Sequence, residues 1–82
     1  MTDAEHKELF LYLQNTKIEA FRLASEININ NLESIKIKLE FLKKVYNENK
    51  AKYQYDHNLN GELIDLLRGI SRIEIAILAI EK

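Results

Sequence analysis

Residues that break secondary structure are scarce in this sequence, which limits the folds open to it. The 82 residues include no proline and only two glycines, Gly61 and Gly69. Between Asn31 and Asn60 neither residue type occurs, and turn-forming residues gather only in the segment YDHNLNG (55–61). A fold with many β-strands needs frequent turns, whereas long helices need few. The chain is therefore predicted to be all-α.

One segment, SIKIKLEF (34–41), alternates apolar and charged residues as a half-buried strand does. A helix explains more of the sequence, because apolar positions recur three and four residues apart over three heptads. In this second helix the positions are Leu32, Ile35, Leu39, Leu42, Tyr46, Asn49 and Tyr53. The β-branched residues of RIEIAILAIEK (72–82) leave a strand open as the alternative for the last segment.

The same spacing predicts three helices, at about 3–26, 31–54 and 61–81. The apolar seam of the first consists of Leu9, Leu13, Thr16, Ala20, Leu23 and Ile27, and that of the third consists of Leu63, Leu66, Ile70, Ile73, Ile77 and Ile80. Thr2 with Glu5 fits a capping box for the first helix, while Asn30 and Asn60 are the candidate N-caps of the other two. The connections ININ and YDHNLN are short, so consecutive helices are expected to be antiparallel. The expected architecture is an up-down-up antiparallel three-helix bundle, a single helical domain over residues 1–82.

Charged residues beside the apolar seams give a separate test of this architecture. Antiparallel packing predicts four ion pairs: Lys43–Glu74, Lys36–Glu81, Glu19–Lys38 and Glu5–Lys52. Lysines that face glutamates across a helix seam are not free to bind phosphate. The total charge is also nearly balanced, at 12 basic and 13 acidic residues, so nucleic acid is not favoured as a partner.

The helices carry more large apolar residues than one small bundle can bury. We expect such a surplus to be covered by a second copy of the chain, giving a homodimer, or else by a different protein. A lipid surface and an apolar monomer are the remaining alternatives. The residues expected to contact a protein partner are Ile64, Leu67, Ile75 and Leu78 of the third helix, Ile37 and Phe41 of the second, and Tyr53, Tyr55 and His57.

Groups for catalysis or metal binding are few. There is no cysteine, and the two histidines are His6 and His57. Asp56 and His57 are adjacent, but side chains next to each other in one loop rarely point at one atom, and no third ligand or serine lies at a suggestive spacing. No glycine-rich phosphate loop occurs. We therefore expect no catalytic residue, no metal site and no cofactor, and we interpret 53–58 as a linker or a recognition loop.

The segment LNGELIDLL (59–67) resembles the Ser-Gln-Glu-Leu-Asp stretch of small sporulation-type aspartyl-phosphate phosphatases over fewer than ten residues. In this chain Ile64 stands in place of the aspartate, and Asn60-Gly61 replace the serine and glutamine. The resemblance implies only an alternative function, as a phosphatase-like regulator. An enzyme or phosphatase of this kind would act through Asp56 and His57 or through Asp65.

The leading hypothesis is a non-enzymatic helical protein that binds and modulates another protein, such as an inhibitor, an antitoxin-like or immunity-like protein or a phage-type regulator. A helical DNA-binding regulator is the first alternative, with Lys44, Lys50, Arg68 and Arg72 as its basic residues. The acidic N-terminus does not resemble a secretory signal, and no apolar run reaches the length of a membrane span. A cytoplasmic location is therefore expected.

Overall fold

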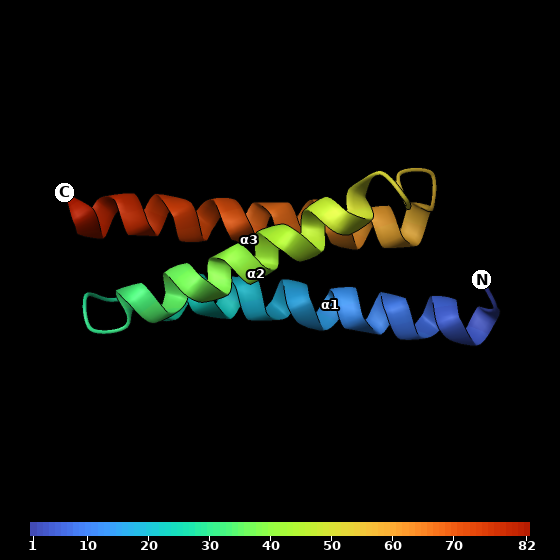
Figure 1. Cartoon of the computed structure of the whole chain (residues 1–82), viewed down its shortest axis with the longest axis horizontal. Helices are drawn as coiled ribbons and strands as arrows, with labels where there is room; N and C mark the ends of the chain where they lie inside the picture. The colour runs from blue at the N-terminus through green and yellow to red at the C-terminus, as the bar shows by residue number, and fades with distance from the viewer.

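The computed structural model describes all residues from 1 to 82 and contains three α-helices and no β-strand (Figure 1). The helices are α1 (Asp3–Glu26), α2 (Leu32–Lys50) and α3 (His57–Glu81). Together they form an elongated bundle of 46 × 18 × 16 Å. The all-α prediction is confirmed, and residues 34–41 and 72–81 are helical, so the strand alternatives are wrong.

The predicted bounds hold for α1 and for the end of α3, and the start of α2 differs by one residue, whereas the end of α2 and the start of α3 are wrong. Thr2 and Glu5 form the expected capping box, in which the Glu5 amide donates to Thr2 Oγ1 at 3.1 Å. Helix α2 begins at Leu32 after Asn31, whose side chain accepts from the Asn28 amide at 2.8 Å instead of capping the helix. The asparagine side chains of the Asn28–Asn31 turn therefore form hydrogen bonds within the turn itself.

Helix α3 begins four residues earlier than predicted. Asp56 is its N-cap and accepts from the Leu59 amide at 3.0 Å, so Asn60 lies inside the helix. The prediction took Gly61 as the boundary, but a glycine in the first turns of a helix lowers its stability without ending it. Helix α2 ends at Lys50 instead of residue 54, and a turn at 51–55 leads into α3.

The buried core follows the predicted seams. Four α1 residues of the seam are buried, three of α2 and five of α3. They are Leu13, Thr16, Ala20 and Leu23; Ile35, Leu39 and Leu42; and Leu63, Leu66, Ile70, Ile73 and Ile77. Val45 and Leu59 complete the apolar core. Burial of these side chains is the main stabilising contribution to such a bundle.

Helices α1 and α3 make the most extensive contact of the bundle. At its closest point two small residues meet: a Cβ added to Gly69 would lie 2.7 Å from Ala20 Cβ. Because neither residue has a larger side chain, the two backbones can come close together at this point. On the same interface Lys17 Nζ lies 2.6 Å from Glu62 Oε2. No aligned hydrogen-bond donor reaches that buried oxygen, so the lysine is what compensates its charge.

Helix α2 is joined to α3 by two of the predicted ion pairs. Lys36 Nζ lies 3.0 Å from Glu81, and Lys43 Nζ lies 3.1 Å from Glu74. The bond to Glu81 raises the pKa of Lys36, and the bond to Glu74 raises the pKa of Lys43. Figure 1 shows α2 crossing obliquely over the other two helices. It contacts α1 far less than it contacts α3.

The other two predicted ion pairs are wrong. Glu19 binds Arg22 of its own helix, with Arg22 Nε donating to Glu19 Oε2 at 2.9 Å. Glu5 is occupied by the capping box at Thr2. Glu19 and Lys38 line the same groove without forming an ion pair, and Lys52 lies in the turn after α2, which ends at Lys50. In addition, none of the three helices has a stretch apolar enough to span a bilayer.

Candidate functional site

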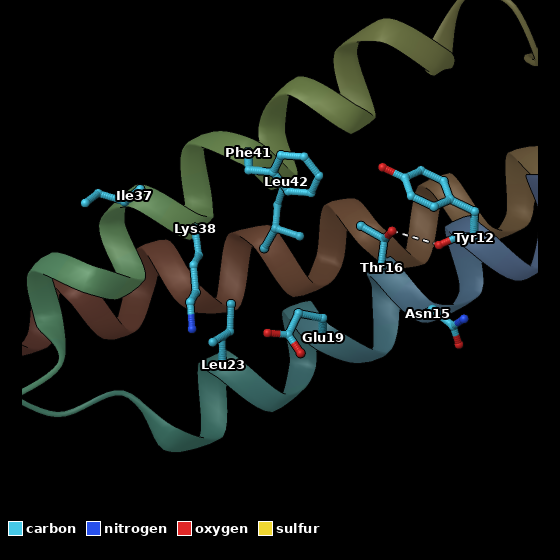
Figure 2. Close-up of a pocket in the computed structure, with 9 residues that line it drawn as sticks. All are labelled: Tyr12, Asn15, Thr16, Glu19, Leu23, Ile37, Lys38, Phe41 and Leu42. Carbon is cyan, nitrogen blue, oxygen red and sulfur yellow. Dashed lines mark hydrogen bonds between the residues drawn. The ribbon is translucent and has the colours of Figure 1, made fainter.

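The weak contact between α1 and α2 leaves an apolar groove between them. Its volume is about 440 Å³, within the range of ligand and protein-docking sites. The nine lining residues are Tyr12, Asn15, Thr16, Glu19 and Leu23 of α1, and Ile37, Lys38, Phe41 and Leu42 of α2. Figure 2 shows that these side chains come from two facing helices, with α3 behind them.

The floor of the groove belongs to the core, whereas its edges are exposed. Leu23 and Leu42 are buried, while Phe41 is 55% exposed and Ile37 is 74% exposed. Thr16 is the one buried polar side chain, and its hydroxyl donates to the Tyr12 carbonyl at 2.7 Å (Figure 2). That bond satisfies the hydroxyl inside α1, so Thr16 presents mainly its methyl group to the groove.

Two opposite charges flank the apolar surface. Glu19 lies on the α1 side, and Lys38 extends from α2 toward α1 (Figure 2). The hydrogen bond from Arg22 lowers the pKa of Glu19, and the field of Lys38 contributes in the same direction. Glu19 is therefore a carboxylate near neutral pH. The groove can bind an apolar surface that carries charges of both signs at its margins.

A second apolar surface runs along the outside of α3. We call it the α3 stripe and define it as Ile64, Leu67, Ile75 and Leu78, which are 40–66% exposed. Their spacing puts them along one side of the helix. Next to the stripe, Leu39, Glu74, Ile77 and Leu78 line a shallower hollow of about 220 Å³. The stripe is long enough to contact a helix, but it lacks a deep pocket.

The predicted contact residues therefore fall on three separate surfaces. Ile37 and Phe41 lie at the groove, and the four α3 residues form the stripe. Tyr53 is half-buried against the core, while Tyr55 is 93% exposed and His57 is exposed in the first turn of α3. Within the expected recognition loop, Tyr55 and His57 are therefore exposed, whereas Tyr53 is partly covered by the core.

Sequence reasoning missed part of the groove, notably Tyr12, Glu19 and Lys38. The charge pattern predicts that Glu19 and Lys38 form an ion pair with each other. A signal was present in the two small residues, Ala20 and Gly69, because small side chains at one interface bring that pair of helices together. Helix α1, which packs closely against α3, packs less closely against α2.

The structure also shows where the candidate chemical groups lie. Asp56 does not pair with His57; its Oδ2 lies 2.7 Å from His6 Nε2, so it links the first turn of α1 to the start of α3. The pKa of Asp56 is lowered chiefly by the Leu59 amide and also by His6. Asp65 lies 3.3 Å from Arg68. No three histidine or acidic side chains come together to hold a metal ion.

The basic residues of the DNA-binding alternative each contact a group of the chain itself. Lys44 Nζ is 3.9 Å from Glu48, and Arg68 pairs with Asp65. Lys50 lies over the Tyr46 ring at 5.7 Å. Arg72 lies over the Phe21 ring at 5.3 Å. These four residues are divided between α2 and α3, and two of them, Lys44 and Arg68, pair with an acidic side chain.

Comparisons with protein-family models, with curated proteins and with solved structures find no match to this chain.

Proposed function

We propose that this chain is a non-enzymatic helical protein that binds and modulates another protein, acting as a homodimer of up-down-up three-helix bundles. The observation that carries the proposal is the amount of large apolar side chain left at the surface. Twelve such residues are exposed in a chain of 82. Monomers rarely expose contiguous apolar patches of more than a few hundred Å².

The up-down-up arrangement is supported by the two ion pairs between α2 and α3. Lys36 binds Glu81, and seven residues later Lys43 binds Glu74, seven residues earlier. Residue numbers that rise on one helix as they fall on the other are typical of antiparallel neighbours. The path of the chain in Figure 1 agrees with this arrangement at both connections.

Seven of the twelve exposed apolar residues lie on two faces, which supports two separate contacts. One is the groove between α1 and α2, and the other is the α3 stripe. A homodimer can cover one face while the partner protein covers the other. We assign the partner to the α3 stripe, because a row of aliphatic side chains along a helix suits packing against a helix of another protein. Inhibitors, antitoxin-like and immunity-like proteins and phage-type regulators are functions that fit a small chain of this kind.

The test is affinity capture from the cells that naturally express the protein, with quantitative mass spectrometry. The variant Ile75→Lys with Leu78→Lys places two charges on the stripe, and the matched control is Ile29→Lys. Ile29 is also an exposed aliphatic residue, at 76%, but it lies in the first connection. We expect a specific partner to be retained by the wild type and the control and to fall about tenfold with the double variant.

Two results would contradict the proposed function. The first is that the wild-type protein captures nothing above the background of an unrelated helical bundle. The second is that the double variant captures the same partner as well as the wild type does, which would remove the stripe from the binding surface. Circular dichroism of each variant shows whether the fold is retained.

A further inference from the structure

The two sides of the groove carry opposite charges that the chain does not pair with each other. Glu19 on α1 binds Arg22, and Lys38 on α2 forms no ion pair within the chain. Lys38 is exposed, and it lies across an apolar floor from the carboxylate. A groove with a carboxylate on one side and a lysine on the other can pair these two groups with those of a second copy, provided that the copy is turned so that its sides are exchanged.

We propose that a second copy of the chain covers this groove, with the two-fold axis running along the groove so that α1 of each copy packs over α2 of the other. This inference rests on the proposed homodimer and names the surface and the symmetry that would form it. Phe41, Ile37 and Tyr12 of both copies become buried in the contact. The α3 stripe stays free for the partner protein.

This symmetry determines which charged residues of the two copies face each other. A half-turn about an axis along the groove exchanges its two sides but leaves each residue at the same position along its length. Glu19 and Lys38 both line the groove and lie near enough for the lysine to act on the carboxylate. In the dimer Glu19 therefore faces Lys38 of the second copy, twice. An axis across the groove would instead set α1 on α1 and α2 on α2.

The available surface is large enough for a stable contact. A long side of the molecule measures 46 Å by 18 Å. A stable protein–protein interface takes roughly 800 Å² from each partner, so the contact would extend beyond the groove over most of that side. The centre of the contact would be apolar and aromatic, with Phe41 and Tyr12, and its margin would be charged. This arrangement is typical of specific interfaces.

Charge reversal tests the pairing by its effect on the dissociation constant of the dimer, measured by sedimentation equilibrium. We expect Lys38→Glu and Glu19→Lys each to weaken the dimer by about tenfold or more, because each places two like-charged pairs in the contact. The double variant with both changes restores opposite pairs, and we expect it to return to within about threefold of the wild type. Arg68→Glu changes the charge by the same amount on α3, outside the groove, and is the matched control.

Disulfide cross-linking tests the symmetry, since the chain has no cysteine of its own. A mixture of Glu19→Cys and Lys38→Cys chains is expected to form a covalent dimer under mild oxidation. Either variant alone is expected to remain uncross-linked at the same concentration. A covalent dimer from Glu19→Cys alone would indicate an axis across the groove and would overturn the proposal.

Other outcomes distinguish this inference from the proposed function. If Phe41→Lys remains dimeric and Ile75→Lys becomes monomeric, the homodimer stands but its contact is on α3, and the groove proposal is wrong. If the wild type is monomeric at every concentration while capture still recovers a partner, the groove proposal fails and the binding function survives. If the double charge swap is as weak as either single change, the pairing is wrong.

Discussion

Helix α1 packs closely against α3 and only loosely against α2. Against α3 it presents Ala20 to Gly69, at a distance so short that a single added methyl group would overlap. Toward α2 it presents the larger Tyr12 and the charged Glu19, and a groove of about 440 Å³ remains between the helices. The difference shows that a three-helix bundle of this length need not close all three of its interfaces. The closed interface contributes to stability, and the open one is the surface that we propose a second copy covers.

The largest expected difference is between a core side chain and a groove side chain. Leu66 is fully buried, so Leu66→Ala should lower the free energy of unfolding by about 2–5 kcal/mol. Phe41 loses more atoms in Phe41→Ala, yet it is largely exposed in the single chain and should cost under about 1 kcal/mol there. Urea denaturation at a concentration where the protein is monomeric measures both. Equal losses would mean that the groove is closed in the monomer.

The two glycines should respond in opposite directions to the same substitution. At Gly61 nothing lies within 4 Å of an added Cβ, so Gly61→Ala should stabilise α3 by about 0.5–1 kcal/mol. At Gly69 the same methyl group meets Ala20 Cβ at 2.7 Å. The cost of forcing the helices apart is roughly 1–3 kcal/mol, which exceeds the gain in helix propensity of about 1 kcal/mol.

Gly69→Ala should therefore destabilise the protein, and thermal or urea unfolding of the two variants side by side checks the sign. If Gly69→Ala is as stabilising as Gly61→Ala, then α1 and α3 are further apart than described. The contrast between the closed and the open interface of α1 would then lose its basis.

A smaller effect is expected from the ion pair between Lys43 and Glu74. A double-mutant cycle with alanine at both positions should give a coupling energy of about 0.2–1 kcal/mol that falls as salt is added. The matched control is the cycle of Glu5 with Lys52, the pair predicted from the sequence and absent from the structure. We expect that cycle to give no coupling, and a coupling as large as that of Lys43 and Glu74 would indicate that α1 and α2 meet along their length.

The smallest effect concerns pH. Asp56 has a lowered pKa in the folded chain, because its carboxylate accepts from the Leu59 amide and lies against His6. Its contribution to stability is therefore present above the pKa of aspartate in the unfolded chain and is lost as the pH falls through the lower folded value. Asp56→Asn keeps a capping acceptor but cannot ionise.

Thermal unfolding of the wild type and of Asp56→Asn from about pH 6 down to about pH 2 measures this contribution. The wild type should lose more stability than the variant over the acidic part of the range. Parallel curves would show that Asp56 contributes nothing through its charge.

The sequence predicted the helices and the α2–α3 register well, for a physical reason. Three-four spacing of leucine and isoleucine is set by the helical repeat, and the spacing of Lys36 and Lys43 matches that of Glu74 and Glu81. The apolar spacing is a property of a single helix, and the matching charge spacing is a property of two adjacent helices. They do not depend on how three helices are arranged around one another.

The candidate groove could not be predicted in the same way. The charge pattern is compatible with Glu19 paired to Lys38 within one chain, but in the structure Glu19 binds Arg22 and Lys38 forms no ion pair. How closely α1 packs against α2 and α3 is a property of the assembled bundle. The start of α3 was predicted wrongly for a local reason, because Asn60 and Asp56 are both good N-cap residues and it is Asp56 that accepts from the Leu59 amide.

The most direct test of the open face is side-chain footprinting by hydroxyl radicals over a range of protein concentrations. Phe41 and Tyr12 should be labelled at concentrations where the protein is monomeric and protected where it dimerises, while Tyr55, at 93% exposure, should be labelled equally throughout. Labelling of Phe41 and Tyr12 that never decreases would contradict the account, because their face would not be covered by a second copy. Protection already at the lowest concentration would contradict it too, because the groove would then be closed within one chain.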